Sequence, residues 1–130
     1  MVTNHTNEKE KILFGQDNII CPKFISGIVG GRTLDVTGVA GTTISAGHVI
    51  ITDGNGAYKP MPVAEGGEAY AVLPEGFKFA GILYRSVLTK RPSASIMTNG
   101  QLNIVAAPFA LPEGFKTACP FIETVKDEEA

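Results

Sequence analysis

The sequence predicts a small, mainly β domain, and two observations lead to this prediction. Gly and Pro contribute 15 and 8 of the 130 residues, so turn-forming residues interrupt nearly every window in which a helical repeat is sought. Between these turns, short runs rich in β-branched residues recur, as is typical of strands. Apolar residues make up 44% of the chain, which excludes global disorder. We expect a small β-barrel or a β-sandwich-like domain with hairpins and one or two short helices.

The chain is predicted to form one domain with a tail at each end, because 130 residues leave little room for two domains. Residues 1–18 are polar and charged and are expected to form an extended, flexible N-terminal arm. Residues 19–125 are assigned to the β-rich domain and residues 126–130 to an acidic C-terminal tail. No run of about 18 apolar residues occurs, which argues against a transmembrane helix. Residues 1–16 lack the apolar stretch of a secretory signal.

The strongest loop signal is Asp-Gly-Asn-Gly at residues 53–56, which predicts a hairpin between strands at residues 49–52 and 57–59. Pro60 and Pro62 then restrict the second strand to the edge of a sheet, since proline cannot donate a backbone hydrogen bond. Three further strand predictions rest on apolar, β-branched runs bounded by turn residues. They lie at residues 25–29, 42–46 and 79–88.

A second hairpin is predicted around the dipeptide Asn99-Gly100, with strands at residues 94–98 and 101–106. A two-residue Asn-Gly loop favours a type I′ turn, because both of its residues adopt positive φ. This register places Met97, Leu102 and Ile104 on one face, which we expect to face the core, and Ile96 on the other face.

One hexapeptide, Leu-Pro-Glu-Gly-Phe-Lys, occurs at residues 73–78 and again at residues 111–116. Proline followed by Glu-Gly suits a tight turn or a single helical turn. The flanking residues do not repeat, so a solenoid is excluded. We expect a reused turn that inserts Phe77 and Phe115 into the core; a paired role at a subunit interface is the alternative.

The 11 basic and 13 acidic residues are unevenly placed along the chain. Residues 1–18 and 123–130 hold 10 of them, whereas residues 36–52 and 92–112 hold none. One interpretation is a β surface coated with Ser and Thr, which needs few charges. The other is that a partner covers part of this surface, because the cores of interfaces are depleted of charge. The net charge of −2 argues against a nucleic-acid-binding protein.

Few residues suit catalysis, and we expect no enzymatic activity. His48 follows a glycine in a predicted turn and is expected to be a surface or packed histidine. Ser45, His48 and Asp53 compose a catalytic triad only on paper, since the chain has no Gly-x-Ser-x-Gly elbow. Glu65 and Glu68 flank two glycines and are expected in a flexible loop, not as the paired carboxylates of a glycosidase.

Metal and cofactor sites are not expected either. The loop at residues 53–56 lacks the later acidic ligands of an EF-hand calcium site. Cys21 and Cys119 lack the C-x-x-C spacing of zinc and redox motifs. They are expected to be two buried free thiols, with a disulfide between them as the alternative.

Four motifs follow one another through the domain: Gly-Thr-Thr-Ile-Ser-Ala-Gly-His-Val-Ile at residues 41–50, Asp-Gly-Asn-Gly-Ala-Tyr-Lys-Pro at residues 53–60, Phe-Ala-Gly-Ile-Leu at residues 79–83 and Ala-Ser-Ile-Met-Thr-Asn-Gly-Gln-Leu-Asn at residues 94–103. Their order and spacing resemble the head decoration and head fibre proteins of tailed bacteriophages, such as the lambdoid capsid decoration proteins. The resemblance covers about residues 32–122 and includes the ending Phe121-Ile122.

The resemblance implies a virion structural protein. Such proteins are small β-rich domains that commonly form homotrimers on the outer surface of the capsid, where they bind the major capsid protein. This one would be synthesised in the cytoplasm of the bacterial host. The N-terminal segment of the family often becomes ordered on the shell, and residues 1–18 match it by position and composition. The capsid contacts expected on this basis are Lys9, Lys11, Ile12, Leu13 and Phe14.

An alternative is a small β-barrel binding or adhesion module that recognises a carbohydrate or another cell-surface ligand. Its candidates for stacking against a ligand are Tyr58, Tyr70 and Tyr84. The chain has no Trp, which counts against an aromatic binding platform.

Overall fold

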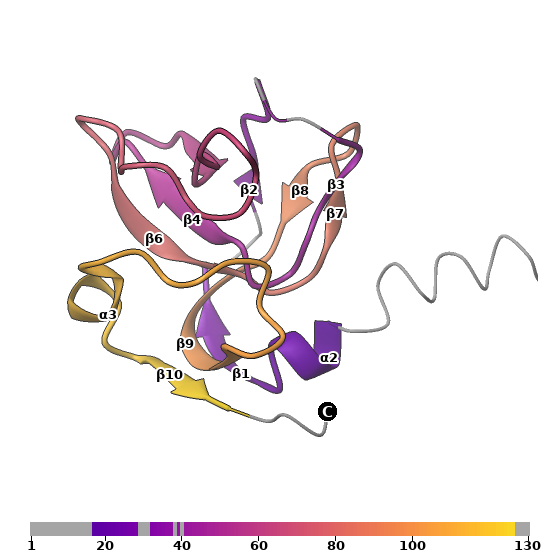
Figure 1. The fold of residues 1–130 in the computed structure, drawn as a ribbon, viewed down its shortest axis with the longest axis vertical. Helices are drawn as coiled ribbons and strands as arrows, with labels where there is room; N and C mark the ends of the chain where they lie inside the picture. The colour runs from indigo at the N-terminus through magenta and orange to yellow at the C-terminus, as the bar shows by residue number, and fades with distance from the viewer. Residues whose placement is uncertain (1–16, 29–31, 38, 40, 127–130) are drawn as a thin grey trace, which may run out of the picture.

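The computed structural model describes residues 17–28, 32–37, 39 and 41–126, and short strands dominate it (Figure 1). The mainly β class predicted from the sequence is therefore confirmed. In chain order the elements are α2 (Asp17–Ile20), β1 (Lys23–Gly27), β2 (Arg32–Thr33), β3 (Thr43–Ile44), β4 (Val49–Thr52), β5 (Tyr58–Pro60), β6 (Lys78–Leu83), β7 (Val87–Leu88), β8 (Ser93–Ala94), β9 (Ile96–Asn103), α3 (Phe115–Ala118) and β10 (Ile122–Val125).

The main sheet is open and has the strand order β1-β9-β6-β4-β5, with β10 as an additional parallel partner of β9. The path begins at β1 and ends at β5, so the sheet does not close into a barrel. Two small antiparallel sheets, β2-β8 and β3-β7, lie in the upper part of Figure 1, whereas β1, β9 and β10 lie in the lower part beside α2 and α3.

Both faces of the main sheet are buried, because successive residues of its central strands enter two different hydrophobic clusters. In β4, Val49 and Ile51 belong to the cluster that includes Phe115 of α3. Ile50, which lies between them, belongs to the cluster that includes residues of β3 and β7. This alternation follows from the two-residue repeat of a strand. It explains why all four residues of β4 are buried and apolar or β-branched and gives the domain a sandwich-like core.

The first predicted hairpin is confirmed, because β4 and β5 are antiparallel with Thr52 opposite Tyr58. The turn is held by side chains: the Thr52 hydroxyl donates to the Ala57 carbonyl oxygen at 2.8 Å, and the Asp53 carboxylate accepts the Asn55 amide at 2.7 Å. Proline at residue 60 ends β5, which is the last strand of the sheet, as the sequence predicts.

The second predicted hairpin is wrong, because β9 runs through Asn99 and Gly100 as one continuous strand. Gly100 does not have a positive φ, and it pairs with Phe24 of β1 on one side and Ile122 of β10 on the other. The glycine is needed for close approach: a Cβ placed there would lie 2.4 Å from the Lys23 carbonyl oxygen. Long-range pairing on both edges of β9 therefore overrides the local turn preference of Asn-Gly.

Of the three other strand predictions, two are confirmed with shifted bounds, and the third is confirmed only in part because its run is divided. The strand expected at residues 25–29 is β1, which begins two residues earlier and ends at Gly27. The strand expected at residues 42–46 is the short β3. The run at residues 79–88 divides into β6 and β7, which belong to different sheets.

The repeated hexapeptide forms the same turn twice. The Phe77 amide donates to the Pro74 carbonyl oxygen at 3.2 Å, and the Phe115 amide donates to that of Pro112 at the same distance. The glycines of the two turns have φ values of 85° and 87°, which suit the third position of a type II turn. Phe115 then begins α3 and is fully buried, whereas Phe77 is half-buried at the start of β6. The expected reused turn is confirmed, but of its two phenylalanines Phe115 alone is fully inserted into the core.

The two cysteines are buried free thiols, as expected. The Cys21 thiol donates to the Leu83 carbonyl oxygen over 3.8 Å, and burial raises the pKa of the Cys119 thiol. Both belong to the hydrophobic cluster around Phe115.

Candidate functional site

The β1 end of the main sheet is its most exposed part. Every residue of β1 is exposed or half-exposed, and among the residues that the structure describes the strand has β9 as its one partner. Phe24 and Ile25 keep 41% and 56% of their surface exposed. Ile25 lies in an irregularity of the register, between the pairs Phe24–Gly100 and Ser26–Asn99. Such a bulge disfavours the addition of a further straight strand, so a partner would be recognised here mainly through side chains.

A third apolar side chain is exposed on the other side of β9. Phe121 precedes β10 and is 69% exposed, and its carbonyl oxygen accepts the Gly100 amide at 3.2 Å. The Phe24 ring packs against Tyr84 at a centroid distance of 4.7 Å, so Phe24 is held in place while still exposed. We call β1, β9 and β10, with Phe24, Ile25 and Phe121, the open end of the sheet.

The opposite end of the sheet, at β5, is protected. Pro60 lacks an N–H group, and the Tyr58 carbonyl oxygen accepts the Asp35 amide at 2.8 Å. The buried Leu34 forms a parallel bridge with Tyr58, and the Arg32 guanidinium lies 5.7 Å from the centroid of the Tyr58 ring. The segment before β3 therefore covers this edge.

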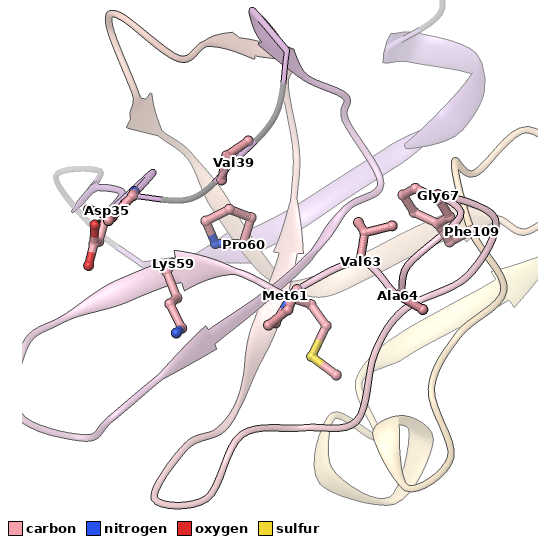
Figure 2. Close-up of a pocket in the computed structure, with 11 residues that line it drawn as sticks. Asp35, Val39, Lys59, Pro60, Met61, Val63, Ala64, Gly67 and Phe109 are labelled. Atoms are coloured by element: carbon pink, nitrogen blue, oxygen red, sulfur yellow. Dashed lines mark hydrogen bonds between the residues drawn. The ribbon is translucent and has the colours of Figure 1, made fainter.

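A pocket of about 500 Å³ lies beside β5 (Figure 2), a volume within the range of small-ligand sites. Figure 2 shows Asp35 and Lys59 at one side of the pocket, and Val63, Ala64 and Phe109 at the other. Its apolar walls are formed by Val39, Pro60, Met61, Val63, Ala64 and Phe109.

Three rings support the wall of this pocket. His48 lies edge-on to Tyr70 and Phe109 at centroid distances of 5.2 and 5.8 Å, and Tyr70 and Phe109 are 4.9 Å apart. The Tyr70 hydroxyl accepts the Val49 amide at 2.9 Å, and burial raises the pKa of Tyr70. The ring contacts and the hydrogen bond connect the loop of Tyr70, the segment of Phe109 and β4, which are distant from one another in the sequence.

His48 is the packed histidine that the sequence suggested. Its Nε2 donates to the Met61 carbonyl oxygen at 2.8 Å, so the neutral ring carries its proton on Nε2. Burial lowers the pKa of His48, and the bond to Met61 opposes this shift. The ring is therefore a structural element of the pocket wall.

The loop at residues 61–72 is a hairpin closed by two backbone hydrogen bonds. The Ala71 amide donates to the Pro62 carbonyl oxygen, and the Ala64 amide donates to that of Ala69, both at 2.8 Å. Glu65 and Glu68 are exposed near the tip of this hairpin, and neither lines the pocket beside β5.

Two charged groups mark one side of the pocket. Asp35 is exposed, and hydrogen bonds from the side chain and backbone of Thr37 lower the pKa of its carboxyl, with a smaller contribution from Lys59. The Lys59 Nζ lies 4.4 Å from the centroid of the Phe77 ring. The pocket therefore combines an apolar interior with a carboxylate and an ammonium group at one side.

The triad that exists on paper is not assembled. The Ser45 hydroxyl donates to the Ala46 carbonyl oxygen, His48 donates to Met61, and the Asp53 carboxylate caps its own turn. Within residues 17–28, 32–37, 39 and 41–126, no group of three or more His, Cys, Asp or Glu side chains is placed to hold a metal ion. The helices of the described residues are too short or too polar to cross a membrane.

The three candidate stacking tyrosines have different surroundings. Tyr58 lies on β5 under Arg32, Tyr70 is in the ring cluster, and Tyr84 packs between Phe24 and Arg85. They do not contribute to one platform. The expected capsid contacts, Lys9, Lys11, Ile12, Leu13 and Phe14, lie outside the described residues.

Two residues that sequence reasoning did not single out are central to these surfaces. Phe24 precedes the apolar run at residues 25–29, and only its position on an edge strand makes it exposed. Phe109 lies in the uncharged stretch, and its contact with Tyr70 joins residues that are far apart in the sequence. Neither carries a local sequence signal.

No protein-family model, no curated protein and no solved structure matches this chain.

Proposed function

We propose that this chain is a structural protein of a tailed-bacteriophage virion, a head decoration or head fibre protein that binds the outer surface of the capsid as a homotrimer. The observation that carries the proposal is the open end of the sheet. Phe24, Ile25 and Phe121 are exposed there, beside the uncharged stretch of residues 92–112. Large apolar groups that are exposed together are typical of a surface that another protein covers.

The order of the four sequence motifs selects this interpretation among the proteins that associate through a β surface. Three motifs lie on or lead into strands of the main sheet: residues 41–50 lead into β4, residues 53–60 form the hairpin to the edge strand β5, and residues 79–83 lie in β6. The fourth motif contains most of β9. The resemblance therefore involves the strands that build the core of the domain.

In this proposal the protein stabilises the capsid by mass action. A trimer that binds the assembled shell, and not the free capsid subunits, lowers the free energy of the shell by its binding free energy. Three copies of each contact act together, which raises the effective affinity without new kinds of contact. The partners are sister subunits and the major capsid protein, and the location is the virion surface after synthesis in the host cytoplasm.

Residues 1–18 are assigned to the capsid contact, with the basic side chains of Lys9 and Lys11 and the apolar side chains of residues 12–14 as the contact groups. A segment that becomes ordered on binding loses conformational entropy. That cost makes attachment selective for a shell geometry that offers all its contacts at once.

Co-sedimentation with capsids of the phage that encodes the protein tests the proposal. The wild type is expected to pellet with mature capsids at a fixed ratio to the major capsid protein, and the Leu13→Glu variant is expected to stay trimeric and pellet less. Wild-type protein that remains in the supernatant with these capsids at every concentration would overturn the proposal.

A further inference from the structure

We propose that the pocket beside β5 binds a peptide segment in which charged residues precede bulky apolar residues, and that residues 8–14 of this chain are its occupant. The inference goes beyond capsid attachment and does not depend on it. It rests on the shape and chemistry of the pocket and on the order of residues in that segment.

The pocket wall is held by a backbone hydrogen bond at Met61 and by ring contacts at Phe109. The Met61 amide donates to the Val49 carbonyl oxygen at 2.8 Å, which fixes the start of the wall to β4. Met61 itself is fully buried. Phe109 is held against His48 and Tyr70. A rigid apolar wall of this kind loses little conformational entropy on binding, which favours affinity.

The pocket wall favours an occupant that binds through its side chains and not one that pairs as an added β-strand. Pro60 and Pro62 both line the pocket and have no N–H group to offer to an added strand. The neighbouring Tyr58 carbonyl oxygen is already bonded to Asp35. Recognition there must come from apolar groups that enter the cavity, with specificity from the charges at its side.

Those charges have both signs. The Asp35 carboxylate is held in its ionised form by Thr37, and it suits a basic side chain. Lys59 lies on the same side of the pocket as Asp35 (Figure 2), with its ammonium group 4.4 Å from the centroid of the Phe77 ring, and it suits an acidic side chain. An occupant that complements both groups carries acidic and basic residues side by side, next to its apolar residues.

The chain contains such a segment. Residues 8–11 are Glu-Lys-Glu-Lys, and residues 12–14 are Ile-Leu-Phe. Alternating charges are followed at once by three bulky apolar side chains, a combination that matches a pocket with charged groups at one side and apolar walls. Outside the described domain, this is the only run of three bulky apolar residues in the printed sequence. In the free protein, residues 12–14 would occupy the pocket. They would contact the capsid only after leaving the pocket.

The chain has no Trp, so a single introduced Trp reports on one position. The experiment measures fluorescence of the full-length Phe14→Trp protein. Docking predicts emission at shorter wavelength than free Trp and protection from acrylamide quenching. Adding Val63→Arg, on a pocket residue exposed enough to tolerate the change, is expected to abolish both. Adding Val72→Arg, on a residue that is 89% exposed and outside this pocket, is the matched control and is expected to change neither.

A second variant keeps the test independent of any packing defect. Asp35→Lys replaces an exposed carboxylate and is expected to weaken the protection of the introduced Trp from quenching while circular dichroism stays unchanged. Emission like that of free Trp in the Phe14→Trp protein would overturn the inference. So would shielded emission that persists in both the Val63→Arg and Asp35→Lys backgrounds. Neither result bears on capsid co-sedimentation, so this inference and the proposed function fail separately.

Discussion

The two ends of the main sheet differ in how far other parts of the chain cover them. At β5, proline, the bridge from Leu34 and the bond from Asp35 cover the edge. At β1, every residue is exposed or half-exposed, and two of its side chains are large and apolar. Sheet edges are sites of unwanted association that proteins normally protect. The proposed homotrimer accounts for this difference, because a sister subunit would cover the apolar end.

The largest expected effect is at the protected end, where Leu34→Ala removes a buried side chain that bridges to β5. We expect a loss of about 2–5 kcal/mol in the free energy of unfolding, since leucine deletions in cores leave a cavity. Urea denaturation measures it. Val72→Ala, at an exposed position, serves as the control, and an equal loss in both variants would contradict the assigned role of Leu34.

The next largest effect is expected at the open end. Gly100→Ala places a Cβ 2.4 Å from the Lys23 carbonyl oxygen and 2.5 Å from the Met97 sulfur, so β1 must shift away from β9. We expect a cost of about 1–3 kcal/mol, as for other overpacked sites. The neighbouring Asn99→Ala variant is the control for denaturation. Unchanged stability of Gly100→Ala would show that the close pairing of β1 with β9 is not required.

A smaller effect concerns the pocket wall at the protected end. Because burial lowers the pKa of His48 in the folded state, the unfolded chain takes up the proton first as pH falls below about 6.5. The free energy of unfolding is therefore expected to decrease below that pH, by at most about 1.4 kcal/mol per pH unit.

Thermal unfolding of wild type and His48→Gln between pH 8 and pH 5 measures this dependence. The Gln side chain retains a donor for the Met61 carbonyl oxygen but does not titrate. The variant is expected to lose part of the pH dependence, and identical profiles would contradict the buried neutral state of His48.

The smallest effect is expected from the Lys59 ammonium group over the Phe77 ring. Lys59→Met keeps most of the apolar stem and removes the charge, and we expect a loss of about 0.5–1 kcal/mol. Lys116→Met, on the exposed side of α3, is the matched control in denaturation. A gain in stability on removal of the Lys59 charge would refute a favourable contact.

The sequence predicted local features well. The Asp-Gly-Asn-Gly loop forms the β4–β5 hairpin, and the repeated hexapeptide forms one turn twice, because both depend on the backbone preferences of Gly and Pro. Asn99-Gly100 misled for the same reason: its local preference is for a turn, but pairing on both edges of β9 determines its structure.

The candidate surfaces were less predictable, because they depend on contacts between distant residues. The ring cluster joins residues 48, 70 and 109, and the pocket joins residues 35, 59 and 63. The apolar run beginning at Ile25 predicted a strand, but nothing in it indicates that the strand lies at an edge with its side chains exposed. Strand order, which is a property of the whole fold, decides exposure.

In the proposed homotrimer, sister subunits cover the open end of the sheet. Multi-angle light scattering of the wild type and of the Ile25→Glu/Phe121→Glu variant tests it directly, because both positions are exposed and such substitutions change the stability of the domain itself little. We predict a wild-type mass about three times the 13.7 kDa of the chain and a folded variant of monomeric mass. A monomeric wild type at high concentration, or a variant that remains trimeric, would contradict the account.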